Sequence, residues 1–131
     1  MKLEMKIILL NKLYFIMLLF KLNDLELVKI ISRPSKVCKT PYVADINLNE
    51  TSTMAHTPAL GCCGLNDKGA NVYVMKMLKP KKCTHSVELA LTSDDVLVGT
   101  NPKLAETLVG NSLNNNFIKV INYKNENIYN F

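Results

Sequence analysis

Between residues 25 and 100, hydrophobic residues recur with the two-residue period that is typical of β-strands. The alternation is clearest in "HSVELAL", where Val87, Leu89 and Leu91 alternate with small or polar residues. Stretches that contain Pro, Gly, Asn or Asp separate the alternating segments, as turns between strands do. We expect six short strands, at residues 25–33, 42–48, 52–57, 71–78, 85–91 and 96–100. Short strands at this spacing indicate a mainly β fold, a small barrel or sandwich.

After residue 100 the hydrophobic period changes to that of a helix. Asn101 can cap a helix, and Pro102 suits the first helical position because its missing N–H is not needed there. An apolar stripe that would face the barrel follows at helical spacing and comprises Leu104, Ala105, Leu108 and Val109. We expect Gly110 or the triple Asn at residues 114–116 to end the helix, and the tail favours one last strand at residues 117–121.

Residues 1–20 are an apolar N-terminal extension that superficially resembles a signal peptide. Asn11 and Lys12 interrupt the apolar run, no small-residue cleavage site follows, and a membrane span needs about 20 apolar residues. We therefore expect neither a signal peptide nor a stable membrane anchor. Met17 is an alternative start, in which case residues 1–16 would not be translated. We expect the barrel and its helix to occupy residues 25–113, and residues 114–131 to be a truncated polar tail.

The composition fits one compact domain with a core, since the chain has 131 residues of which 48% are hydrophobic. A formal net charge of +5 favours an anionic partner, although the excess of positive charge is modest. The four cysteines lack the regular spacing of a secreted disulfide framework and lie at Cys38, Cys62, Cys63 and Cys83. We expect reduced thiols in a cytoplasmic protein.

The stretch "AHTPALGCCGL" at residues 55–65 invites a metal or thiol hypothesis. The candidate ligands are Cys62, Cys63, Cys83, His56 and His85. Zinc thiolates usually come from C-x₂₋₄-C knuckles, whereas adjacent cysteines in an extended stretch point to opposite sides. Cys83 and His85 are two residues apart and can place both side chains on one side of a strand, so a metal site stays open as an alternative. Pro58, Gly61 and Gly64 favour a strand exit and a turn instead, and we predict no metal and no cofactor.

Several short motifs follow one another in an order that matches a known family. His56, Pro58 and Gly61 match three positions of a His-Cys-Pro-Asn-Thr-Gly motif, and Glu88 and Leu89 match a Trp-Glu-Leu segment. The start of the helix matches at Gly99, Asn101, Leu104, Ala105, Leu108 and Val109. Over roughly residues 30–113 the chain therefore resembles the N-terminal part of the sugar fermentation stimulation protein family. It departs from the family pattern, as a divergent branch does, at Thr57, Ala59, Leu60, Val87, Glu106 and Thr107.

This resemblance implies an OB-fold-like barrel of five to six strands with one C-terminal helix, implicated in DNA binding. In the family the barrel is joined to a nuclease-like domain, whose chemistry needs an Asp and a Glu-x-Lys set around Mg²⁺. After Glu106 the sequence holds one acid, Glu126. We therefore predict a DNA-binding module that is not an enzyme. The alternative is an inactive or split-gene fragment that needs a separate nuclease-like domain as partner.

OB-type barrels bind nucleic acid by combining Lys and Arg contacts to phosphate with aromatic stacking. Aromatic support is thin here, because the chain has no Trp and its barrel strands hold only Tyr42 and Tyr73. We predict weak, salt-sensitive, largely sequence-nonspecific binding of DNA, with RNA as the other candidate. If the basic clusters do not converge, each is a solvated loop. The predicted nucleic-acid-binding residues are Arg33, Lys36, Lys39, His56, Lys79, Lys81 and Lys82.

Overall fold

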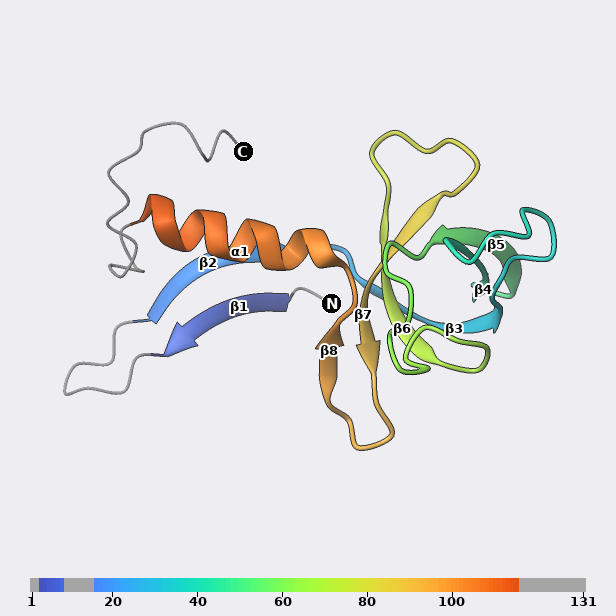
Figure 1. Cartoon of the computed structure of the whole chain (residues 1–131), viewed down its shortest axis with the longest axis horizontal. Helices are drawn as coiled ribbons and strands as arrows, with labels where there is room; N and C mark the ends of the chain where they lie inside the picture. Colours follow the sequence, from blue (N-terminus) through green and yellow to red (C-terminus); the bar gives the residue numbers. More distant parts are fainter. Residues whose placement is uncertain (1–2, 9–15, 116–131) are drawn as a thin grey trace.

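The computed structural model describes residues 3–8 and 16–115, and Figure 1 shows the arrangement of its elements. Eight strands and one helix are found in these ranges. They are β1 (Leu3–Ile8), β2 (Ile16–Leu22), β3 (Glu26–Ser32), β4 (Val43–Leu48), β5 (Thr51–His56), β6 (Asn71–Lys76), β7 (His85–Leu91), β8 (Leu97–Gly99) and α1 (Pro102–Asn114). All six predicted strands are confirmed, with ends that differ from the predicted ones by at most two residues.

Strands β3 to β7 form a closed barrel. Neighbouring strands follow the order β5-β4-β3-β6-β7 in antiparallel pairs. The barrel closes where β5 and β7 pair in parallel, with Ala55 opposite His85 and His56 opposite Ser86. Strand β8 adds to β7 as one extra strand. The structure therefore confirms the predicted fold class, a small OB-fold-like barrel followed by a helix.

Small and β-branched side chains from the five barrel strands fill the interior. Such residues suit the inner face of a strongly curved sheet, where large side chains would not fit. The buried cluster comprises Val28, Ile30, Ala44, Ile46, Ala55, Val72, Val74, Val87 and Ala90. Ile30 is buried and its neighbour Ile31 is exposed, because successive side chains of a strand point to opposite faces, and a β-bulge in the pairing of β3 with β4 follows Ile30.

Helix α1 begins as the sequence predicts. The Asn101 side chain accepts a hydrogen bond from the Lys103 backbone N–H at 3.1 Å, and its amide nitrogen donates to buried Glu88 at 2.8 Å. The helix continues past Gly110 to Asn114, so the triple Asn ends it.

The predicted apolar stripe of α1 is partly wrong. The face turned inward holds Leu104, Leu108 and Ser112, four residues apart, whereas Ala105 and Val109 are exposed. The reason is that α1 runs alongside β2 (Figure 1), which turns the line through residues 104, 108 and 112 toward the rest of the protein.

Strand β2 is an integral part of this fold. It pairs with β1 in an antiparallel ladder that runs from Leu3 opposite Leu22 to Ile8 opposite Ile16. The Asn111 side chain of α1 donates a hydrogen bond to the Leu19 carbonyl at 2.7 Å. A second buried cluster joins β2, the barrel and the helix, and comprises Leu22, Leu25, Leu89 and Leu104.

Two further expectations concern the chain ends. The predicted strand at residues 117–121 and most of the polar tail lie outside the described residues. Within the described ranges, no helix has the length and apolar character that crossing a membrane requires.

Candidate nucleic-acid interface

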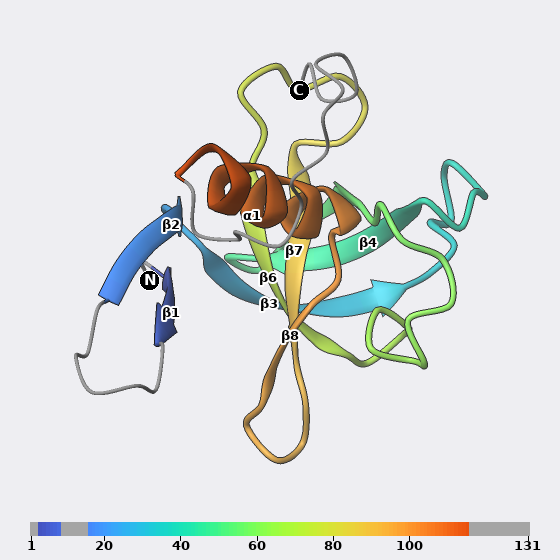
Figure 2. The same cartoon turned by 60° about the vertical axis from the view of Figure 1, so that its left-hand side comes forward.

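Two basic loops meet at one end of the barrel. The β3–β4 loop covers residues 33–42, and the β6–β7 loop covers residues 77–84 and projects well beyond the barrel (Figures 1 and 2). Lys82 from the second loop and Val37, Cys38 and Thr40 from the first line one hollow of about 540 Å³. Val43 and Met54 from the barrel strands complete its lining. The two loops therefore meet at this hollow, and of the predicted basic residues Lys82 lines it.

Neither loop contains an acidic residue. Five lysines in these loops are exposed, and they are Lys36, Lys39, Lys79, Lys81 and Lys82. Lys82 lines the shared hollow, and Lys79 lines a separate one beside Leu78, so the positive charge of the two loops is spread over their surfaces.

The buried carboxylate of Asp45 on β4 shapes the β3–β4 loop. It accepts hydrogen bonds from the hydroxyls of Ser32 at 2.7 Å and Ser35 at 2.6 Å, and from the Lys36 backbone N–H at 2.9 Å. The Ser35 carbonyl in turn accepts from the Lys39 backbone N–H at 2.8 Å. These bonds fold the loop into a compact turn that leaves the Lys36 and Lys39 side chains in solvent.

The environment of Asp45 also sets its charge. Burial by itself raises the pKa of this carboxyl group, but the hydrogen bonds from Ser35, the Lys36 backbone and Ser32 outweigh that effect. The pKa of Asp45 is therefore below its usual value, and the group is ionised at neutral pH. Sequence analysis missed this residue, since a single Asp in a strand gives no signal of its partners.

The Arg33 side chain is buried between two loops, whereas its charge had suggested contact with a nucleic acid. Its side chain is 6% exposed, and its guanidinium group donates to the carbonyl oxygens of Pro41 at 2.7 Å, Ala59 at 2.6 Å and Asn66 at 3.5 Å. Asp67 lies 3.7 Å from the same group. Arg33 thus ties the β3–β4 loop to the β5–β6 loop (residues 57–70), and its donors are not directed at a ligand.

The β6–β7 loop is anchored at its base. The Met77 backbone N–H donates to the Thr84 carbonyl at 2.9 Å, and the Thr84 backbone N–H donates to the Met54 carbonyl on β5 at 3.1 Å. The hydroxyls of Thr53 and Thr84 lie 3.0 Å apart. The lysines between Met77 and Thr84 therefore extend from a fixed base.

His56 flanks the hollow and is not part of its lining. It is the last residue of β5, lies opposite Val43 on β4 and beside Ser86 on β7, and is half-buried. Met54, two residues earlier on β5, lines the hollow. A role for His56 in binding stays a prediction.

Among the aromatic residues, Tyr42 lies nearest in sequence to the lysines of the two loops. Its side chain is 44% exposed at the end of the β3–β4 loop, and its carbonyl accepts a hydrogen bond from the Thr57 backbone N–H at 2.8 Å. Tyr73 instead packs against the leucine cluster beneath α1. Of the two barrel tyrosines, Tyr42 is therefore the one that can stack on a base.

The residues of the metal hypothesis are spread over the molecule. Cys62 lines an apolar hollow beside α1, Cys63 is exposed, and Cys83 closes the β6–β7 loop. His85 is buried, with its Nδ1 2.8 Å from the Thr84 hydroxyl. All four cysteines of the chain are free thiols. Among residues 3–8 and 16–115, no three His, Cys, Asp or Glu side chains gather as metal ligands.

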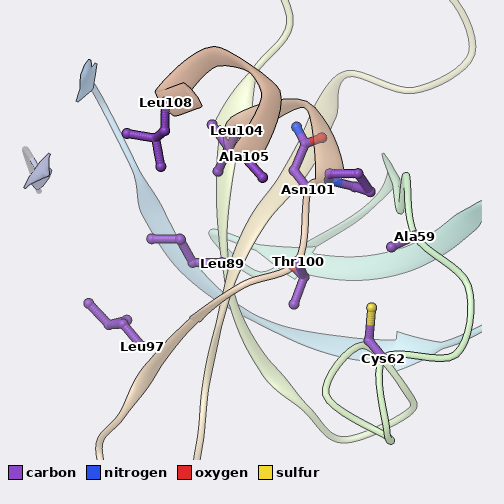
Figure 3. Close-up of a pocket in the computed structure, with 11 residues that line it drawn as sticks. Ala59, Cys62, Leu89, Leu97, Thr100, Asn101, Leu104, Ala105 and Leu108 are labelled. Carbon is purple, nitrogen blue, oxygen red and sulfur yellow. The ribbon is translucent and has the colours of Figure 1, made fainter. Parts of the chain in front are cut away.

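The apolar hollow beside α1 is the second notable surface (Figure 3). It lies between α1, β8 and the β5–β6 loop, and Leu89, Leu97, Leu104 and Leu108 point into it. Several residues that carry the family resemblance, among them Gly99 and Asn101, border it. Its lining is mostly apolar, so it does not suit a phosphate backbone.

No protein-family model matches the chain, and no curated protein matches it either. The resemblance to the sugar fermentation stimulation protein family therefore rests on the motifs given above and stays a prediction.

Proposed function

We propose that this protein is a nucleic-acid-binding module whose β3–β4 and β6–β7 loops contact the phosphate backbone. The observation that carries the proposal is the meeting of these two loops at one hollow of an OB-fold-like barrel, since together they expose five lysines and contain no acidic residue. Barrels of this architecture use flanking loops in this way.

Binding by lysine has predictable properties. Each lysine that neutralises a phosphate releases condensed counterions, so affinity falls as salt rises. Contacts to phosphate carry no sequence information, and binding is therefore largely sequence-nonspecific. Tyr42, exposed at the end of the β3–β4 loop, adds one stacking platform for an unpaired base. DNA is the ligand in this proposal, the site of action is the cytoplasm, and no reaction or cofactor is involved.

Fluorescence anisotropy with a labelled DNA oligonucleotide at low salt tests the proposal. The variant Lys79→Ala/Lys81→Ala/Lys82→Ala should bind about 10- to 100-fold more weakly, because three phosphate contacts are lost. Single-stranded DNA, double-stranded DNA and RNA of the same sequence are compared in parallel.

The matched control is Lys29→Ala/Lys68→Ala/Lys103→Ala, which removes the same charge from exposed lysines outside both loops. Its affinity should stay within about twofold of the wild-type value, since the loop contacts are kept. An equal loss of affinity in the two variants, or no binding by the wild-type protein, would contradict the proposal.

A further inference from the structure

A separate hollow of about 410 Å³ lies where β6 passes into the β6–β7 loop, and we call it the methionine hollow. Its lining comprises Met75, Lys76, Met77, Leu78, Lys79 and Ser86. Met75 on β6 lies directly opposite Ser86 on β7, and each is next in its strand to an interior valine, Val74 or Val87. Because successive side chains of a strand alternate between faces, the methionine hollow lies on the outer face of the barrel.

The apolar side chains of the methionine hollow are accessible to a ligand. Met75 is half-buried, since it also packs against the leucine cluster beneath α1. The Met77 backbone N–H donates to the Thr84 carbonyl at 2.9 Å, which fixes the chain at this point. Leu78, the next residue, is 101% exposed. A ligand that covers Met77 and Leu78 therefore removes apolar surface from water, which favours binding.

The polar side chains of the methionine hollow suit an anion that carries a ring. Lys76 and Lys79 are both exposed, and an ammonium group binds phosphate as a point charge. The Ser86 hydroxyl can donate or accept a hydrogen bond. No acidic residue is part of the lining, so no negative charge there opposes a phosphate.

We propose that the methionine hollow binds one unpaired base of a single-stranded nucleic acid, with Lys76 and Lys79 on the neighbouring phosphates. Thioether sulfurs contact aromatic rings favourably, and flexible methionines adapt to rings of different shape. The site therefore accepts any base and adds little sequence preference. Bases in a duplex are paired and stacked, and they reach such a site only at the cost of unstacking. The inference rests on the proposed function and names its preferred ligand, a single strand.

Fluorescence anisotropy with two labelled single strands of equal length, one intact and one abasic, tests the proposal. Both strands carry the same phosphates, so only the bases differ. The wild-type protein should bind the intact strand about 10-fold more tightly. Met77→Ala/Leu78→Ala should lose most of this preference and keep the wild-type affinity for the abasic strand, because all lysines remain.

The matched control is Leu18→Ala/Leu60→Ala, which shortens two leucines that are each 51% exposed and lie outside the methionine hollow. Its preference for the intact strand should equal that of the wild-type protein. Equal wild-type affinity for the two strands, or a preference that Met77→Ala/Leu78→Ala retains, would overturn the inference and leave lysine-dependent binding standing. Failure to bind either strand would overturn the proposed function as well.

Methyl NMR of protein labelled at its methionine methyl groups locates the base directly. The intact strand should move the Met75 and Met77 signals upfield, because a base stacked on these side chains shields their methyl groups, and the abasic strand should not. Met75→Leu and Met77→Leu assign the two signals. Signals that the intact strand leaves in place would show that no base enters the methionine hollow.

Discussion

At the scale of single residues, Arg33 and the loop lysines have opposite roles. Five donors in a planar fork allow one guanidinium group to satisfy carbonyl oxygens from several loop residues at once. Arg33 uses this geometry on Pro41, Ala59 and Asn66, while Lys36, three residues later, extends into solvent. Charge alone therefore did not reveal which basic residue is structural.

Arg33→Lys should lower the free energy of unfolding by about 2 kcal/mol, because an ammonium group keeps the charge but cannot donate to the carbonyl oxygens of Pro41, Ala59 and Asn66 together. Chemical denaturation measures the change. Lys36→Arg, an exposed substitution in the same loop, is the control and should change stability by no more than about 0.5 kcal/mol. Unchanged stability in Arg33→Lys together with weaker DNA binding would show that Arg33 contacts phosphate.

Asp45 makes the stability of the loop depend on pH. The folded-state pKa of Asp45 lies below the unfolded value of about 3.9, so its ionised form stabilises the protein above that pH. This contribution is lost as the pH falls from the unfolded pKa through the lower folded pKa. Asp45→Asn should therefore cost about 2 kcal/mol at pH 7 and show a smaller further loss below about pH 4 than the wild-type protein does.

Denaturation at neutral and acidic pH measures both effects of Asp45→Asn. Asp94→Asn, in the exposed turn between β7 and β8, should leave stability and its pH dependence as in the wild-type protein. Parallel wild-type and Asp45→Asn curves across the acidic range would rule out the role assigned to this carboxylate.

At the scale of elements, β1 and β2 are the strands that the sequence did not reveal. The run "IMLLFKL" of β2 is apolar except for Lys21 and lacks the alternation that marks β7, so the sequence assigned it to no particular element. Its burial depends on α1, about ninety residues later in the chain, as the hydrogen bond from Asn111 to the Leu19 carbonyl shows.

Two leucines of β2 provide a matched test. Leu22→Ala should lower the free energy of unfolding by about 3 kcal/mol, because Leu22 is 1% exposed within the cluster beneath α1. Leu18→Ala, at a position that is 51% exposed, should cost less than about 1 kcal/mol. Thermal or chemical denaturation gives both values. Equal, small effects would mean that β2 does not pack as described.

The barrel strands and the helix start were predictable because they depend on local signals. Alternation in β7 and the Asn101-Pro102 pair before α1 each specify an element from neighbouring residues. Which residues of α1 face inward was not predictable, because this depends on where β2 packs. Nor was the role of Arg33, whose three acceptors belong to two loops that only the folded barrel brings together.

At the scale of the whole molecule, closure of the barrel creates the candidate interface. The parallel pairing of β5 with β7 places the end of β5 beside the start of β7, and the β6–β7 loop thereby meets Met54 and the β3–β4 loop. Sequence analysis located both basic clusters and left their convergence open, because it depends on pairing between strands that are not neighbours in the chain.

The salt dependence of DNA binding tests most directly whether the two loops form one surface. Lys36→Ala/Lys39→Ala and Lys81→Ala/Lys82→Ala each remove two charges from one loop, and Lys29→Ala/Lys103→Ala removes two from elsewhere. If both loops contact phosphate, each loop variant should reduce the slope of log affinity against log salt by about 2, and the control should leave it unchanged. A slope that either loop variant leaves unaltered, or that the control reduces equally, would contradict a shared interface.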